Sequence, residues 1–219
     1  MTPKIEDCTR CPRLRAYCTD IAQKKKRAYQ NETYWGRPVP SFGSPSPSLL
    51  ICGLAPAAHG ANRTGRMFTG DRSGEWLYRA LYETGFASQA ESYSRKDGLT
   101  LQHAHITAAL HCAPPQNRPS KDELKACAPF LEKEIRMLQS VRVYIVLGKI
   151  ALDALWPLVR PDEQAKKPHF KHGEAVTLKN GRTLIISYHP SQQNTFTGRL
   201  KWPEWIEIFE RARMLTRAH

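Results

Sequence analysis

The sequence lacks the features that define several large classes of protein. Its longest apolar runs, SLLICGLAPAA from residue 48 and VYIVLG from residue 143, are far shorter than the roughly 20 residues of a membrane-spanning helix. The first residues, MTPKIEDCTRCPRLR, contain no apolar segment of the kind found in secretory signal peptides. We therefore expect a soluble protein of the cytoplasm that makes no contact with membranes.

Acidic residues are scarce, since 20 Asp and Glu stand against 33 Lys and Arg, which gives a net charge of +13. Such an excess is typical of proteins that bind a polyanion, because Lys and Arg replace the counterions of phosphate groups. The alternative is an ordinary solvated surface, because the charge is spread out and QKKKRAY at 23–29 is its only dense cluster. Nucleic acid is the polyanion that we expect, which would place the protein with the nucleoid.

After an irregular arm at 1–47, predicted strands alternate with predicted helices, and we treat 1–219 as one domain. Ser73 is the expected N-cap of the first helix, and Ser120 with Glu123 forms a capping box at the second. Asn180-Gly181 predicts a hairpin before the fourth strand. The expected strands cover 48–54, 103–110, 141–148 and 184–188, and the expected helices cover 73–85, 120–139, 149–159 and 201–218.

The expected strands are runs of Ile, Leu and Val without alternation of apolar and polar residues. Such strands are buried on both faces, which predicts a mostly parallel sheet covered by helices on each side. The loops at 54–71 and 189–198 both follow the carboxyl ends of strands. In a parallel sheet these ends share one edge, where ligands usually bind, so we expect the two loops to be neighbours.

Four of the six cysteines pair by position. Cys8 and Cys11 form a C-x2-C motif, and Cys112 is separated from Cys127 by fourteen residues. In a chain expected inside the cell, cysteines favour metal binding or catalysis over disulfides. Four thiolates suit zinc or an iron–sulfur cluster, and the spacing differs from that of a C-x2-C…C-x2-C zinc ribbon. Spacing alone leaves zinc, an iron–sulfur cluster and unrelated thiols open.

The loop at 53–71, GLAPAAHGANRTGRMFTGD, contains four glycines but neither G-x-G-x-x-G nor G-x-x-x-x-G-K-[ST]. A dinucleotide or P-loop site is therefore not indicated, and the glycines instead allow a ligand to approach the backbone closely. Several side chains have a structural explanation beside a functional one. The structural explanation is a core aromatic for Phe68, a charge at a helix N-terminus for Asp71, and a turn residue for Asn117. Cys52 fits the core, and Cys18 is a spare thiol or a further ligand.

GLAPAAHGANRTGRMFTGD after one strand, HPS at 189–191 after another, and the spacing C-x2-C…C-x14-C together resemble the uracil-DNA glycosylase superfamily. The resemblance covers roughly 5–205 and is closest to family 5, the bacterial and archaeal type B enzymes. It implies a three-layer α/β/α sandwich with a mainly parallel four-stranded sheet. It also implies a [4Fe–4S] cluster held by Cys8, Cys11, Cys112 and Cys127.

The implied activity is hydrolysis of the N-glycosidic bond of uracil and other deaminated or modified bases, such as hypoxanthine, in double-stranded DNA. The product is an abasic site, and we expect a monomer. Asp71 would orient water or face the sugar cation, with His59 and Asn62 as rivals, and His189 would donate to the anionic base oxygen. The predicted substrate-binding residues are Gly53, Ala55, Phe68, His59, Asn62, Asn117 and Ser191. The residues predicted to contact DNA are Gln192, Gln193, Asn194 and Arg63.

The sequence departs from related families at two places. Those families carry Asn on the strand before the third cysteine, where TAA stands here at 107–109. The missing amide at Ala108 predicts relaxed base choice. Related families also show HPSPL, whose Leu enters the duplex, whereas the chain continues as SQQN at 191–194. The inserting side chain is therefore not identified by the sequence.

Two other functions stay open on the sequence. One is a non-catalytic iron–sulfur protein that binds nucleic acid, against which the set of Asp71, Phe68 and His189 argues. The other is a nucleotide-binding enzyme, against which the missing phosphate motifs argue. The sequence neither ranks uracil against other bases nor decides whether single-stranded DNA is accepted.

Overall fold

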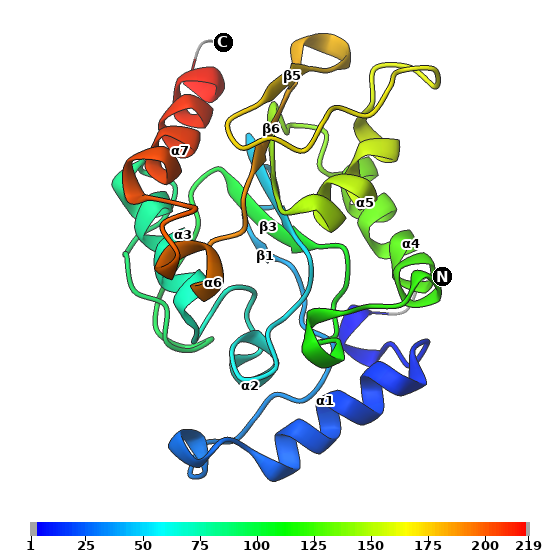
Figure 1. Ribbon diagram of the computed structural model, residues 1–219, viewed down its shortest axis with the longest axis vertical. Helices are drawn as coiled ribbons and strands as arrows, with labels where there is room; N and C mark the ends of the chain where they lie inside the picture. Colours follow the sequence, from blue (N-terminus) through cyan, green and yellow to red (C-terminus); the bar gives the residue numbers. More distant parts are fainter. Residues whose placement is uncertain (1–3, 218–219) are drawn as a thin grey trace.

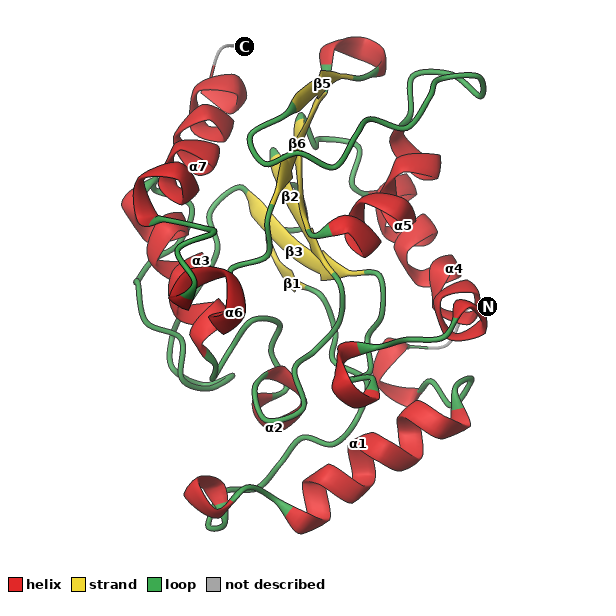
Figure 2. Cartoon of the chain, in the orientation of Figure 1, coloured by secondary structure: helices red, strands yellow, loops and turns green. Residues whose placement is uncertain are grey.

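The computed structural model describes residues 4–217 and is built around a six-stranded sheet (Figures 1 and 2). The strands lie in the order β1-β3-β2-β4-β6-β5. Their bounds are Phe42–Gly43 (β1), Leu49–Gly53 (β2), Ala104–Ala108 (β3), Val143–Leu147 (β4), Ala175–Thr177 (β5) and Thr183–Ser187 (β6). Strands β3, β2, β4 and β6 are parallel, whereas β1 and β5 pair antiparallel with their neighbours. The predicted mainly parallel, four-stranded sheet is confirmed as the centre of a wider one.

The two edge strands account for the difference in strand number. β1 has only two residues and lies in the proline-rich connector before β2, where no apolar pattern indicates a strand. β5 is the first arm of the predicted hairpin, and Thr177 pairs with Thr183 across it. The connection is longer than a two-residue turn and contains a 3-10 helix, Lys179–Gly181 (η4).

Helices cover both faces of the sheet, with α3 and α7 on one side and α4 and α5 on the other (Figure 1). The predicted three-layer sandwich is therefore confirmed. The α-helices are Pro12–Lys24 (α1), Ala61–Thr64 (α2), Arg72–Glu83 (α3), Lys121–Met137 (α4), Lys149–Val159 (α5), Gln192–Phe196 (α6) and Trp202–Arg217 (α7). The remaining 3-10 helices are Ile5–Asp7 (η1), Arg27–Tyr29 (η2) and Pro115–Asn117 (η3).

The central strands have no polar face. All residues of β2 and β4 are buried, so apolar residues follow one another without alternation. In β2, Leu49 and Ile51 pack in the core with α3 and α7, whereas Leu50 and Cys52 pack in the core with α4 and α5. Cys52 is thus a core residue, as its position in an apolar run indicates.

The two predicted helix starts have different outcomes. Ser120 and Glu123 form the predicted capping box at α4, each accepting a hydrogen bond from the other's backbone N–H. The prediction of Ser73 as the cap of α3 is wrong, because the helix begins two residues earlier. Asp71 is the N-cap, and its carboxylate accepts a hydrogen bond from Gly74 N. Asp, Ser and Asn cap helices about equally well, so composition does not distinguish the two positions.

The N-terminal arm packs below the carboxyl ends of the parallel strands, where α1 lies in Figure 2. Leu14 and Cys18 of α1 are fully buried in a third core that also contains Leu110 and Phe130. The arm is therefore attached to the segments that follow β3. None of the helices within residues 4–217 is both long enough and apolar enough to cross a bilayer.

Candidate active site

A large cleft lies at the carboxyl ends of the parallel strands. Leu54 follows β2, Gly148 follows β4 and His189 follows β6, and all three line it. The loops predicted to be neighbours do meet there, since the rings of Phe68 and His189 stack with centroids 5.7 Å apart. The cleft is thus placed where a parallel sheet commonly binds its ligand.

Phe68 is held in a conformation that the surrounding glycines permit. Its backbone has a φ of 53°, which is rare for an aromatic residue. A Cβ atom at Gly53 would lie 2.8 Å from the Phe68 ring, and one at Gly74 would collide with the Phe68 carbonyl. Gly53 and Gly74 therefore act through Phe68, by leaving the space that it occupies. Strained residues of this kind persist where the surrounding structure fixes them, as it does here.

A buried polar network fixes the loop on either side of Phe68. The Arg66 guanidinium forms two hydrogen bonds to Asp97, at 2.8 and 2.6 Å, and also donates to Ser92 and Thr69. Tyr78 of α3 donates to the Met67 carbonyl at 2.7 Å. The sequence gives no signal for this network, because Ser92 and Asp97 lie in a polar loop between the expected elements.

Asp71 combines a structural and an electrostatic position. Its Oδ1 accepts a hydrogen bond from Gly74 N at 3.0 Å, and Oδ2 lies against Gly60, where a Cβ atom would collide with it. Burial raises the pKa of Asp71, while hydrogen bonds from the Gly74 and Ser73 N–H groups act in the opposite direction. The carboxylate is thus fixed at the N-terminus of α3, and Asp71 lines the cleft.

His189 follows β6 and is fixed by its own loop. Asn194 donates from its side chain to the His189 carbonyl at 2.8 Å, and Ser191 caps α6 by accepting from Asn194 N. Burial lowers the pKa of His189 to about 4. The imidazole is therefore neutral near pH 7 and offers one N–H donor and one acceptor nitrogen.

The other predicted substrate residues are divided between the cleft and the protein interior. Ala55, His59, Asn117 and Ser191 line the cleft. His59 is oriented by Tyr34, whose hydroxyl lies 3.0 Å from Nδ1. Asn117 and the preceding Gln116 both have φ above 50°, which is typical of turn residues. Because Asn117 also lines the cleft, it is both a turn residue and a residue of the cleft wall.

Asn62 and Arg63 do not line the cleft. Asn62 is buried and donates to the Cys18 and Ala58 carbonyls, which ties α2 to α1. Arg63 is also buried, and its guanidinium pairs with Glu32 and donates to the His59 and Gly70 carbonyls. Both side chains support the glycine-rich loop from inside the protein.

The residues predicted to contact DNA lie on and beside α6. Gln192 and Gln193 are exposed and line the cleft, whereas Asn194 is engaged with the backbone of its own loop. The sequence analysis missed Phe196, an aromatic side chain that is 68% exposed at the edge of the cleft. The Arg72 guanidinium lies 4.5 Å from its ring centroid.

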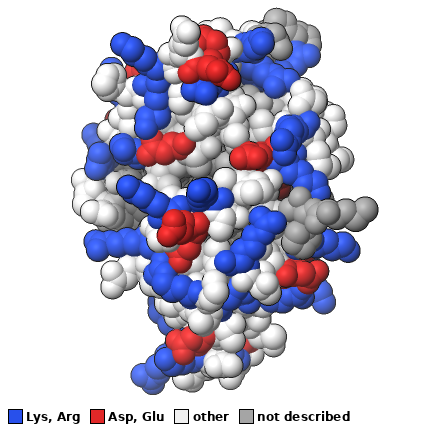
Figure 3. Space-filling view, turned by 90° about the vertical axis from the view of Figure 1, so that its right-hand side faces the viewer, with Lys and Arg blue, Asp and Glu red and all other residues white. Residues whose placement is uncertain are grey.

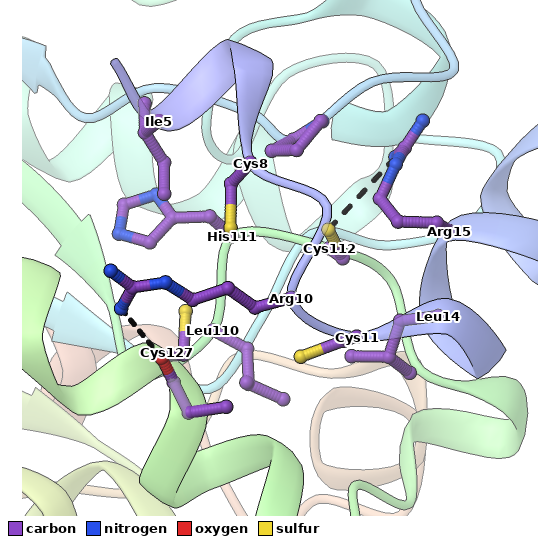
Figure 4. Close-up of a pocket in the computed structure, with 12 residues that line it drawn as sticks. Ile5, Cys8, Arg10, Cys11, Leu14, Arg15, Leu110, His111, Cys112 and Cys127 are labelled. Atoms are coloured by element: carbon purple, nitrogen blue, oxygen red, sulfur yellow. Dashed lines mark hydrogen bonds between the residues drawn. The ribbon is translucent and has the colours of Figure 1, made fainter. Parts of the chain in front are cut away.

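The four paired cysteines converge on one small cavity near the arm (Figure 4). Cys8 and Cys11 come from the segment before α1, Cys112 follows β3, and Cys127 lies on α4. Burial raises the pKa of Cys127 to about 12, and the negative charges of the other three thiolates add to this effect. All four cysteines line the same cavity, which places their side chains around a common space.

The cavity carries cationic groups as well as sulfur. Arg15 approaches Cys112 Sγ at 4.0 Å, and Arg10 crosses the cavity to donate to the Ala126 carbonyl (Figure 4). Cys18 is buried beside Cys112, and hydrogen bonding to Cys112 lowers its pKa. Within residues 4–217, no three His, Cys, Asp or Glu side chains converge closely enough to hold a single metal ion.

Comparisons with known proteins identify the family of the chain. The family model of the uracil DNA glycosylase superfamily matches residues 40–213. A type-5 uracil-DNA glycosylase of Thermus thermophilus is 48% identical over 95% of this chain and 93% of its own length. The type-5 enzyme of Mycobacterium leprae is 47% identical over 98% of this chain and 94% of its own length. The type-5 enzyme of Pyrobaculum aerophilum is 42% identical over 95% of this chain and 89% of its own length. The chain therefore belongs to the uracil-DNA glycosylase superfamily, with the type-5 enzymes among its relatives.

Proposed function

We propose that the cleft binds a nucleotide flipped out of double-stranded DNA and hydrolyses the N-glycosidic bond of uracil or another deaminated base. Membership of the superfamily makes the chain a DNA glycosylase of base excision repair. The observation that carries the site assignment is the meeting of Phe68, Asp71 and His189 at one edge of the sheet. The product would be an abasic site and a free base.

The three side chains suit the charges that form as the bond breaks. The sugar becomes positive and the base negative, and groups already oriented toward those charges lower the barrier most. Asp71 would face the sugar and orient the attacking water. His189, neutral near pH 7, would donate its N–H to the base oxygen. Phe68 would stack on the base, which stabilises binding by about 1–3 kcal/mol.

Base choice is expected to be broad. Ala108 ends β3 beside Gly53 and carries only a methyl group at the position where the family resemblance leads us to expect an amide that reads uracil. The preceding Thr107 is turned away, since its hydroxyl donates to Glu134 and accepts from Ser41. An apolar wall discriminates weakly between analogues that differ by one polar group. We therefore include hypoxanthine among the substrates.

Phe196 is our candidate for the side chain that enters the duplex. It is the one strongly exposed aromatic or large aliphatic side chain described on the cleft wall, and Arg72 supports its ring. An apolar side chain inserted between base pairs compensates for the stacking that is lost when a nucleotide leaves the helix. Gln192 and Gln193, one turn earlier on α6, would then contact the neighbouring backbone.

The four-cysteine cavity fits a [4Fe–4S] cluster. Cys8, Cys11, Cys112 and Cys127 surround one space, and four thiolates are the ligands that such a cluster takes. Bound there, the cluster would supply a covalent tie between the arm, the segment after β3 and α4. Its role would be structural, because the cavity is separate from the cleft and shares no lining residue with it.

We further propose that residues 1–219 act as one glycosylase domain and as a monomer. The arm at 1–47 supplies two of the four thiols and, through Tyr17, Lys26 and Tyr29, part of the cleft wall. A DNA substrate would place the protein in the cytoplasm with the nucleoid.

Incubation with a panel of duplexes tests the proposed function. Each duplex carries one uracil, hypoxanthine or undamaged site, and alkali cleaves the strand wherever a base has been lost. Release of uracil and of hypoxanthine, with undamaged DNA intact, is the expected result. Binding to every duplex without release of any base would favour the non-catalytic iron–sulfur protein.

A further inference from the structure

A second groove lies at the opposite end of the parallel strands from the cleft. It is bounded by the starts of β4 and β6 and by the last turns of α7. Four arginines line it, Arg142, Arg182, Arg213 and Arg217, together with Ser and Thr hydroxyl groups. No Asp or Glu belongs to its described lining, whereas the catalytic cleft contains both signs of charge. The groove therefore has the composition of a site for an anion.

Arg213 lacks a counter-charge among the described residues. Its Nε is buried without a hydrogen-bond partner, and its guanidinium lies 4.9 Å from the Phe86 ring centroid. Burial lowers the pKa of Arg213, and the charge of Arg217, one turn further along α7, lowers it again. The negative end of the α7 dipole attracts cations but does not satisfy the buried donor. A negatively charged ligand in the groove would supply the counter-charge that the described residues do not give Arg213.

Arg182 is fixed on the other side of the groove. Its Nη1 donates to the Tyr144 hydroxyl at 3.3 Å, and its Nη2 donates to the Gln139 carbonyl at 2.9 Å. These neutral acceptors orient the guanidinium without cancelling its charge. A fixed guanidinium binds phosphate with little loss of side-chain entropy.

The lining of this groove differs from the face that carries α4 and α5. On the face that carries α4 and α5, basic and acidic side chains are interspersed (Figure 3), and Asp153 pairs with both Lys149 and Lys167. Within residues 4–217, no carboxylate forms an ion pair with Arg182, Arg213 or Arg217. The groove thus gathers basic side chains with no carboxylate among its described lining residues.

We propose that this groove binds the phosphodiester backbone of a second DNA segment while the cleft holds the damaged one. The two sites are separated by the length of the strands, about 17 Å at 3.3 Å per residue, and they face opposite ways. Duplex DNA is stiff over about 150 base pairs, so one short duplex cannot reach both sites. A glycosylase with two such sites can move directly from one segment to another. This inference goes beyond the catalytic proposal and does not depend on which base is excised.

A bridging experiment tests the second site. A duplex with a tetrahydrofuran abasic analogue is fixed on beads to occupy the cleft, and capture of a labelled, undamaged duplex is measured with the full-length protein. We expect wild-type protein to capture the second duplex and the double variant Arg213→Gln/Arg217→Gln to lose most of that capture. The log–log salt slope for the second duplex should fall by about 2, since two phosphate contacts are removed.

The controls separate this site from general charge and from misfolding. Lys166→Gln/Lys171→Gln removes the same charge from exposed positions outside both grooves and should leave capture unchanged. Excision from a short uracil duplex should be unchanged in both double variants. If Arg213→Gln/Arg217→Gln fails to fold, the single variant Arg217→Glu is used in its place. Sedimentation should show one protein with two duplexes. Absence of capture by the wild type, equal loss in the lysine control, or tight binding of inorganic phosphate in place of DNA would overturn the proposal.

Discussion

At the scale of single residues, burial shifts the pKa values of the two catalytic candidates in opposite directions. It lowers the pKa of His189 to about 4, so the imidazole is a neutral donor rather than a cation. It raises the pKa of Asp71, which the backbone hydrogen bonds of α3 partly offset. A neutral His189 forms no ion pair with Asp71. His189 can therefore act on the base while Asp71 acts on the sugar. Neither pKa shift can be predicted from the sequence, because each depends on how deeply the side chain is buried.

Replacement of His189 tests its role on the base side. His189→Ala should slow single-turnover excision by about 10²–10³, because one preorganised donor is worth that much in rate. The loss should be larger for poor leaving groups, which carry more negative charge in the transition state. Since the imidazole is neutral above a pKa of about 4, wild-type rates should show no step near pH 6.5. A step there that His189→Ala removes would mean that the charged form acts instead.

Restoring an amide at the end of β3 tests base choice. Ala108 is buried beside Gly53, and Ala108→Asn adds two donors and an acceptor at the end of β3. The ratio of uracil to hypoxanthine release should rise, measured as kcat/KM on matched duplexes. Ala109→Ser, which adds a polar group one residue later, is the control. An unchanged ratio in Ala108→Asn would show that this strand does not read the base.

At the scale of elements, the site depends on contacts that cross between segments. The strands, the helices and the shared edge follow from apolar runs and turn residues, so the meeting of the two loops is predictable. The support of Phe68 is not, since Arg66 reaches Asp97 across a polar loop with no periodic pattern. The start of α3 also escapes prediction, because Asp71 and Ser73 are comparable caps and only packing selects one. Phe196 is similar, since exposure rather than residue type distinguishes it from a core aromatic.

Asp97→Asn tests this support. The carboxylate pairs with a guanidinium that is only 4% exposed, so its loss leaves a buried charge unpaired. The free energy of unfolding should fall by about 3 kcal/mol, measured by urea denaturation. Excision by the remaining folded protein should also slow, because Phe68 loses its fixed position. Asp162→Asn, at an exposed turn, should change neither quantity. Unchanged stability in Asp97→Asn would contradict the importance assigned to the network.

At the scale of the whole molecule, the arm and the α/β sandwich are joined through the four-cysteine cavity. The arm also contributes to the cleft wall, so loss of the cysteine site should affect the whole protein rather than one step of the reaction. The sequence pairs the four cysteines by spacing, and the family resemblance implies that they hold a cluster, but neither shows that Cys18 lies buried beside Cys112. That proximity arises because α1 packs on the segment after β3.

Cys8→Ser tests the cluster at this scale. Wild-type protein should be brown and contain iron, and the variant should lose iron, solubility and thermal stability before any separate effect on chemistry. Cys18→Ala should retain the iron if Cys18 is only a neighbour of the site. Colourless wild-type protein with stoichiometric zinc would contradict the iron–sulfur assignment.

Single-turnover release of uracil, measured for wild-type protein and for Asp71→Asn on the same duplex, is the most direct test. Asn caps helices as well as Asp does, so α3 should remain intact and DNA binding should be unchanged. We expect rapid release by the wild type and a loss of about 10² or more in Asp71→Asn, as for removal of a residue that positions the attacking water. Near wild-type release by Asp71→Asn would contradict the role assigned to Asp71 and shift attention to His59. Absence of release by the wild type would contradict the glycosylase assignment itself.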